Sequence, residues 1–349
     1  MLRGQSRGRS PYRSWGAFET THIDYTSRTA NKKCPIEGDG IVYIDPLPKI
    51  VELARDHNVV LINEAHYKPI HRAFIGELAK ALKNIDYNYY GAETFSVSSF
   101  SDNNRNPELS QRGYPVLSDG VYTEEPIFGQ LIETLIDSDY TLFSYESSSP
   151  VPANAKSHIA HRDSEQARNI LSELNKSPDE KVLIHAGYHH IRETIDNSGN
   201  KWMAQFLKEG SGIDPLTISQ TECYSETAFA EGYLGYAMPV NNDGKPLSYN
   251  GYDIVIIPPK EAQYKERPIW LRDVAGRKFI DVPLNLQFDD QYTRITAYDI
   301  QKVDDAVIED YIYRKPGSDK PLSLRPGTYR LKVTDKTKTL LAEEKITVK

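Results

Sequence analysis

The sequence has few cysteines and no long apolar run. Its two cysteines, Cys34 and Cys223, are too few for a disulfide-rich scaffold or a zinc ribbon, and they leave open whether they pair. No stretch approaches the roughly 20 apolar residues that a membrane-spanning helix needs, so we expect no transmembrane segment. The first residues lack the apolar core of a signal peptide. We therefore expect a cytoplasmic location or, if a signal peptide was removed, a periplasmic or secreted one.

An excess of basic residues is also absent. The chain carries 42 Lys and Arg against 49 Asp and Glu, a net charge of −7 with His neutral. Proteins that bind nucleic acids neutralise phosphates with clustered Lys and Arg, so this balance argues against a nucleic-acid partner. One basic cluster, formed by Arg3, Arg7, Arg9 and Arg13, belongs to a polar leader at 1–38. We interpret this leader as a flexible extension rather than a binding arm.

The length of 349 residues suggests about two domains, and the first expected domain spans 39–275. Short β-branched runs in this region are typical of buried parallel strands, and the helix-like segments between them have one apolar face. We expect strands at 58–62, 87–92, 141–145, 181–185, 216–219 and 253–257, and helices at 47–55, 69–82, 127–136, 158–174 and 201–208. This alternation predicts an α/β fold with a mostly parallel sheet flanked by helices.

The second expected domain spans 285–349. Apolar and polar residues alternate along it, and Pro-Gly pairs at 316–317 and 326–327 separate the segments. This pattern predicts a small antiparallel β-sandwich of immunoglobulin-like type. Because the segment has no cluster of catalytic residue types, we expect it to be an accessory domain.

Acidic and imidazole side chains follow four of the expected strands. In chain order they are Glu64 and His66, then Glu93, then Glu146, then His185 with Tyr188, His189 and His190 just after it. The carboxyl ends of parallel strands meet at one edge of the sheet, where ligands bind in open α/β folds. A single glutamate after a strand is commonly a helix cap, but four such strand ends favour a functional cleft, because crowding unpartnered acids is costly. We expect a small-molecule substrate there.

A cation is expected near the same edge. Arg162 lies in the first turns of the expected helix at 158–174. It either pairs with Glu93 or Glu146, or binds an anionic substrate through two parallel hydrogen bonds, or forms a surface salt bridge with Asp163. The sequence leaves these three interpretations open.

Four motifs together resemble the erythromycin esterase / ChaN-like / Tiki / TraB superfamily. They are Asn63-Glu64-Ala65-His66, Ala92-Glu93, the segment from Arg162-Asp163 to Ala167, and Gly187-Tyr188-His189-His190. The resemblance covers about 40–270 and departs at Asn63, where the family usually has Gly. It implies an α/β fold with its active cleft at the strand ends. It also implies one of several activities: hydrolysis of macrolide lactones with a His as general base, metal-dependent proteolysis, or haem binding.

Within this resemblance we expect a hydrolase that cleaves an ester or related acyl bond. His66 would act as general base toward water, because imidazole titrates near neutral pH. Glu64 or Glu93 would orient it, Arg162 would stabilise developing negative charge, and His190 would be a second acid or base. The sequence has no Gly-x-Ser-x-Gly motif, so direct attack by water is simpler than a serine nucleophile.

Other readings remain open. The substrate-binding candidates are Glu146, His185, Tyr188 and His189. A divalent metal, Zn²⁺ or Mn²⁺, would use His66, His190, Glu64 and Glu93 as ligands. Haem would need an exposed axial ligand, for which His189 and His71 are the candidates. A non-catalytic protein whose C-terminal β region docks a partner is the remaining alternative, and the sequence indicates no oligomeric state.

Overall fold

A computed structural model describes residues 38, 40–152, 157–196, 199–223 and 229–349. The leader expected at 1–38 lies, apart from residue 38, outside the described residues, and so do its basic cluster (Arg3, Arg7, Arg9 and Arg13) and Cys34. Within the described residues, no helix combines the length and apolar character needed to cross a membrane.

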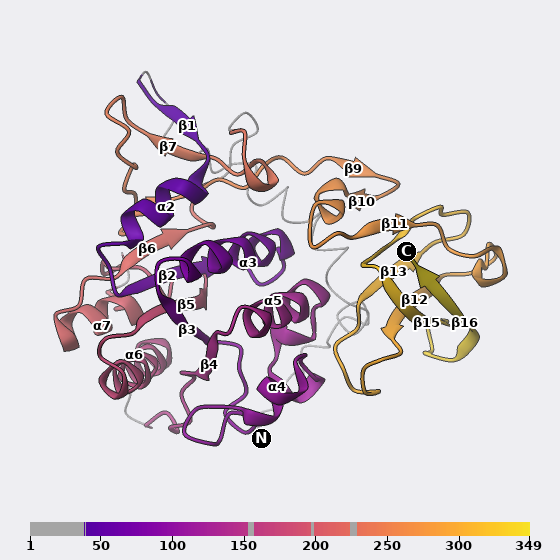
Figure 1. Ribbon diagram of the computed structural model, residues 1–349, viewed down its shortest axis with the longest axis horizontal. Helices are drawn as coiled ribbons and strands as arrows, with labels where there is room; N and C mark the ends of the chain where they lie inside the picture. The colour runs from indigo at the N-terminus through magenta and orange to yellow at the C-terminus, as the bar shows by residue number, and fades with distance from the viewer. Residues whose placement is uncertain (1–37, 39, 153–156, 197–198, 224–228) are drawn as a thin grey trace, which may run out of the picture.

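A six-stranded parallel sheet forms the centre of the molecule (Figure 1). Its order is β4-β3-β5-β2-β6-β8, and every neighbouring pair is parallel. The strands are β2 (Val59–Glu64), β3 (Tyr87–Ala92), β4 (Thr141–Ser144), β5 (Lys181–Gly187), β6 (Leu216–Ser219) and β8 (Ile254–Val255). The expected α/β fold with a parallel sheet is confirmed.

Helices cover both faces of this sheet. They are α2 (Pro46–Ala54), α3 (Pro69–Lys83), α5 (Pro126–Asp137), α6 (His158–Lys176) and α7 (Met203–Ser211). Alternate residues of β2 point to opposite faces: Val60 packs in the core with α2, α3 and α5, whereas Val59 packs in the core with α6 and α7. The α7 helix begins two residues later than expected, because Trp202 has extended dihedral angles and stands before the first turn.

Several short elements have no clear sequence pattern. The long segment between β3 and α5 contains α4 (Pro107–Arg112) and two 3₁₀ turns, η2 (Leu117–Asp119) and η3 (Tyr122–Glu124). Strands β1 (Val42–Ile44) and β7 (Met238–Val240) pair antiparallel outside the main sheet, as do β9 (Gln263–Tyr264) and β10 (Arg267–Pro268). Two further 3₁₀ turns are η4 (Tyr233–Gly235) and η5 (Ile269–Arg272).

The C-terminal region consists of antiparallel sheets, as expected. One has the order β13-β12-β15-β16, with β12 (Thr293–Asp299), β13 (Asp310–Arg314), β15 (Gly327–Thr334) and β16 (Leu340–Val348). The other pairs β11 (Lys278–Ile280) with β14 (Leu322–Leu324), and η6 (Leu284–Leu286) follows β11. Because β11 precedes residue 285 and pairs within this region, we propose that the C-terminal unit begins near residue 277.

Buried polar contacts join these strands to α5, beside which they lie in Figure 1. Arg277 donates to the Gln130 side chain at 2.8 Å and pairs with Glu309 at 2.9 Å. Arg325 pairs with Glu309 and also with Glu133 of α5, at 2.6 and 2.8 Å. Burial alone would raise the pKa of Glu309, but Arg277 and Arg325 outweigh it and hold the pKa at about 2. The interface thus depends on ionised groups that satisfy one another.

Arg277→Gln should lower the free energy of unfolding by about 3 kcal/mol, because it leaves a buried carboxylate with one arginine partner fewer. Urea denaturation followed by circular dichroism measures the change. Arg330→Gln, which removes an exposed ion pair with Asp304, is the matched control and should have little effect. Equal midpoints for the two variants would contradict the assignment of this interface to the Arg277–Glu309 pair.

Candidate functional site

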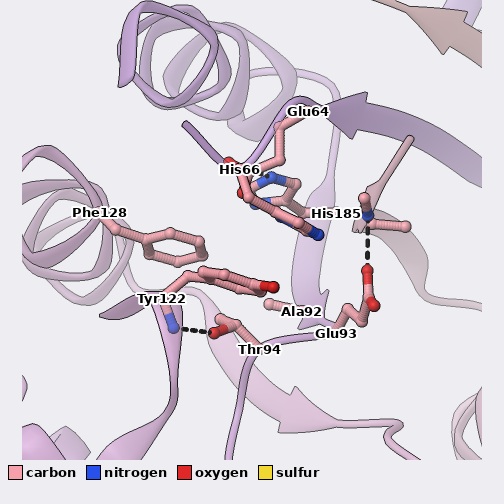
Figure 2. A pocket seen from close by; sticks show the side chains of 10 residues that line it. Glu64, His66, Ala92, Glu93, Thr94, Tyr122, Phe128 and His185 are labelled. Atoms are coloured by element: carbon pink, nitrogen blue, oxygen red, sulfur yellow. Dashed lines mark hydrogen bonds and ion pairs between the residues drawn. The ribbon is translucent and has the colours of Figure 1, made fainter. Parts of the chain in front are cut away.

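A small pocket lies at the carboxyl ends of β2, β3 and β5 (Figure 2). It contains about 170 Å³ of empty space. Its lining residues are Glu64, His66, Ala92, Glu93, Thr94, Tyr122, Phe128, His185, Ala186 and Gly187. Parallel strands bring these groups together because β2 ends at Glu64, β3 ends one residue before Glu93, and β5 ends at Gly187.

Glu64 orients His66. The Nδ1 atom of His66 lies 2.9 Å from one Glu64 oxygen, so Nδ1–H donates to the carboxylate and Nε2 faces the pocket. Arg72, from α3, binds both Glu64 oxygens at 2.6 and 2.7 Å. Burial alone would raise the pKa of Glu64, but Arg72 and His185 outweigh it and hold the pKa well below its ordinary value. Glu64 is therefore an ionised carboxylate at neutral pH.

A second carboxylate–imidazole pair lies beside Glu93, outside the residues that line the pocket. His190 Nδ1 lies 2.8 Å from Asp163, whose second oxygen accepts from the backbone N–H of Met203 at the start of α7. Asp163 is fully buried. Burial alone would lower the pKa of His190, but its hydrogen bond to Asp163 and the nearby charge of Glu93 raise it. The Nε2 atom of His190 lies 3.6 Å from Glu93.

Glu93 connects the two halves of the site. One of its oxygens accepts from Arg162 at 2.6 Å and the other accepts from the Gly187 backbone N–H at 2.6 Å. Burial alone would raise the pKa of Glu93, but His190 and Arg162 lower it further than burial raises it. Arg162 also binds both oxygens of Glu146, at 2.9 and 2.5 Å, and approaches His190 Nε2 at 3.3 Å. Arg162 thus pairs with both expected glutamates at once.

Gly187 is required by close approach. A Cβ atom placed on Gly187 would lie 2.3 Å from Cε1 and 2.5 Å from Nε2 of His66, and 3.1 Å from the Glu93 carboxylate. His66 and Glu93 therefore face the same point above the end of β5. The absence of a side chain at this position makes room for both groups.

The substrate-binding candidates occupy different environments. His185 is buried; its Nδ1 lies 2.7 Å from the Tyr90 hydroxyl and its Nε2 lies 3.1 Å from Glu64. Glu146 is held by Arg162. Tyr188 has a positive φ of 43° and packs edge-on against His66 at 5.0 Å, whereas His189 is 44% exposed and contacts Tyr252 at 3.2 Å.

Asn63 stands at the position where the family named in the sequence analysis usually has glycine. Its side chain is fully buried, donates to the Tyr188 carbonyl at 2.6 Å and accepts from the Gln220 N–H at 2.7 Å. It therefore ties β2 to the loops that follow β5 and β6 and does not protrude into the pocket entrance.

The donor arrangement fits a metal or haem poorly. Among the described residues, no group of three His, Cys, Asp or Glu side chains is arranged to hold a metal ion. The proposed ligands Glu64 and Glu93 are each bound by an arginine, and His66 and His190 each use Nδ1 on a carboxylate. His71, a haem candidate, is 2% exposed and its Nδ1 accepts from the Ala65 N–H. Burial lowers the pKa of His71 to about 3, so it is a neutral core histidine.

Sequence reasoning did not single out Arg72, Asp163 or Tyr122 as site residues. Arg72 lies within α3 and belongs to no recognisable motif. From the sequence, Asp163 was expected only as a possible surface salt-bridge partner of Arg162. Tyr122 lies in the long β3–α5 segment, outside the strands and helices expected from the sequence. An acid at the buried end of a strand needs a cation nearby, which was the available signal for Arg72.

Gly187→Ala should displace the His66 imidazole from Glu64, because the new Cβ would overlap the ring. A crystal structure of the variant measures the His66–Glu64 distance directly. Gly76→Ala in α3 is the control, since its Cβ would meet Leu131 at an ordinary 3.6 Å. An unmoved His66 in the Gly187 variant would contradict this account of the glycine.

His190 should make stability depend on pH. Its folded pKa is raised above the ordinary 6.5, so the stabilisation is fully present below that value and is lost as pH rises through the folded pKa. Asp163→Asn removes a main cause of the increase and should shift the His190 titration measured by NMR to lower pH. The titration of the exposed His189 is the internal control. An unchanged His190 titration in the variant would refute the pairing with Asp163.

The sequence matches no family model and no curated protein. Among solved structures, the type III effector HopBA1 is 16% identical over 63% of this chain and 97% of its own, with a TM-score of 0.39. ChaN of Campylobacter jejuni, described with cofacial heme binding, is 13% identical over 64% of this chain and 99% of its own, with a TM-score of 0.37. RRSP, a MARTX toxin effector domain from Vibrio vulnificus, is 16% identical over 50% of this chain and 36% of its own, with a TM-score of 0.36. At these identities and TM-scores, none of the three structures assigns a family or an activity to this chain.

Proposed function

We propose that this protein is a hydrolase that cleaves an ester or related acyl bond with water as the nucleophile. The observation that carries the proposal is the pair of imidazoles, each fixed at Nδ1 by a buried carboxylate and each with Nε2 on the side of Glu93. Two such groups can divide the proton transfers that hydrolysis requires. The pocket at the strand ends provides the place where they would act.

His66 is the proposed general base. Glu64 accepts a hydrogen bond from Nδ1–H of His66. The lone pair of Nε2 is then free to take a proton from water. Arg72 balances much of the Glu64 charge, because it binds both carboxylate oxygens. An ionised carboxylate thus holds His66 with Nε2 toward the pocket, which is the orientation that a general base needs.

His190 is the proposed general acid. Asp163 has no arginine bound to it in the described contacts and Glu93 is close, so the site favours the protonated imidazolium. The raised pKa of His190 agrees with this role. From Nε2 the imidazolium can give its proton to the oxygen that leaves when the acyl bond breaks.

Glu93 and Arg162 are proposed to set the distance between the acid and the base. Glu93 spans from the Gly187 N–H to Arg162, and Arg162 is in turn held by Glu146. Because two carboxylates already bind the guanidinium, its capacity to stabilise a further negative charge is reduced. We therefore assign Arg162 chiefly to positioning, in place of the anion-stabilising role expected from sequence.

The other activities suggested by the resemblance have less support from the geometry. A metal would have to compete with arginines and imidazole hydrogen bonds for its ligands. Haem would have to use the exposed His189, since His71 lies in the core. The C-terminal strands could dock a partner, and through their buried contacts with α5 they would also support the proposed catalytic region.

His66→Ala should reduce turnover by about 10² to 10⁴-fold, because it removes the general base, while leaving the fold intact. Hydrolysis of a panel of aryl esters, alkyl esters and lactones by the purified full chain measures the loss. His57→Ala is the control, since this half-buried histidine precedes β2 at the opposite edge of the sheet. Wild-type turnover in the His66 variant, or no hydrolysis of any panel member by the wild type, would refute the proposed function.

A further inference from the structure

Tyr122 faces the pocket and has no role in the mechanism so far. Its ring stacks on the His66 imidazole, with centroids 4.0 Å apart and planes inclined by 13°. Figure 2 shows the phenol oxygen directed toward the middle of the pocket, on the side of Glu93. Within the described part of the chain this hydroxyl forms no hydrogen bond. A polar group that points into a pocket and lacks a partner there is available to a ligand.

The backbone holds Tyr122 in this position. Its N–H donates to the Thr94 hydroxyl at 2.7 Å, and the N–H of Val121 donates to the Thr94 carbonyl at 3.2 Å. The Tyr122 carbonyl accepts from Glu125, the residue that caps α5 and also binds Arg72. The tyrosine is therefore fixed to the end of β3 and to the start of α5.

The phenol remains a donor at neutral pH. Burial raises the pKa of Tyr122, and the negative charges of Glu93 and Glu64 raise it further. Two other donors beside the pocket are already in use: the Gly187 N–H and Arg162 both donate to Glu93, and Arg162 also donates to Glu146. Water attack on an acyl carbon needs a donor for the oxygen that becomes negative.

We propose that the Tyr122 hydroxyl donates the hydrogen bond that stabilises the oxyanion formed during acyl hydrolysis, an inference that rests on the proposed function. Water oxygen bonds to the acyl carbon while His66 Nε2 takes one of its protons, and the carbonyl π electrons move to the carbonyl oxygen. Tyr122 donates a hydrogen bond to that oxygen and keeps its proton. The carbonyl then re-forms, the bond to the leaving oxygen breaks, and that oxygen takes the proton of His190. Proton exchange with solvent restores His66 and His190.

Tyr122→Phe is the sharpest variant, because it keeps the ring stacked on His66 and removes only the hydroxyl. We expect kcat to fall by about 10² to 10³-fold with KM changed only slightly, as for the loss of one oxyanion donor. Tyr114→Phe is the matched control. It removes a hydroxyl of the same β3–α5 segment that accepts a hydrogen bond from the Val303 N–H. It should retain wild-type turnover.

A comparison of oxygen and sulfur substrates separates this role from a structural one. A thionoester replaces the carbonyl oxygen by sulfur, a weaker hydrogen-bond acceptor, so the wild type should prefer the oxygen ester strongly. Tyr122→Phe should lose most of that preference, because its donor is gone. Loss of the acid in His190→Gln should instead slow alkyl esters more than aryl esters, whose leaving oxygens need less protonation.

The outcomes distinguish the two proposals. If His66→Ala abolishes hydrolysis but Tyr122→Phe stays within threefold of the wild type, the Tyr122 role is wrong and the proposed function stands. If wild-type protein hydrolyses thionoesters as fast as oxygen esters, the Tyr122 role is also wrong, even if the Phe variant does not fold. If His66→Ala leaves activity unchanged, both proposals fail.

Discussion

The site depends on the buried ion pair between Arg72 and Glu64. Glu64 is 2% exposed and Arg72 is 1% exposed, so either group alone would bear a large desolvation cost. Arg72 donates a hydrogen bond to each Glu64 oxygen. It also donates to the His66 carbonyl at 2.7 Å and to Glu125 at 3.0 Å. Glu125 caps α5 through the N–H groups of two residues. One guanidinium therefore fixes the end of β2, the loop with His66 and the start of α5.

This arrangement explains how two similar carboxylate–imidazole pairs can have different roles. The charge of Glu64 is shared among Arg72, His185 and His66, so it has a limited effect on any one partner. Within the described contacts, Asp163 is bound by a backbone N–H and by His190, and Glu93 lies on the far side of the ring. These carboxylates raise the pKa of His190, although Arg162 approaches Nε2 at 3.3 Å and opposes them. The two imidazoles thus have different electrostatic surroundings, in keeping with the proposed division into a base and an acid.

The sequence predicted the parts of the fold and site that depend on short spacings. Buried strands such as β2 have an unbroken apolar pattern, and an acid just after a strand must lie at the sheet edge, so Glu64, Glu93 and Glu146 could be placed without a structure. Contacts across the chain could not be placed. The partner of Glu64 lies on α3, Asp163 binds the start of α7, and Tyr122 reaches His66 from a segment with no periodicity. Each of these contacts depends on how helices and loops pack against the sheet, and the spacing of residues along the sequence does not determine that packing.

The role of the C-terminal strands is likewise hard to predict from sequence. Their composition suggests an accessory unit, but this region contacts the β3–α5 segment that carries Tyr122. Val307 donates to the Pro115 carbonyl at 3.1 Å, and Leu117 donates to the Asp305 carbonyl at 3.0 Å. Asp119 closes the next turn by accepting from Val116 and Arg112, and Tyr122 follows three residues later. Arg277 and Arg325 hold α5 from the same side. The position of the Tyr122 hydroxyl over His66 is therefore supported by a region that contains none of the proposed catalytic residues, and removing that region would alter the pocket as well as any surface it offers to a partner.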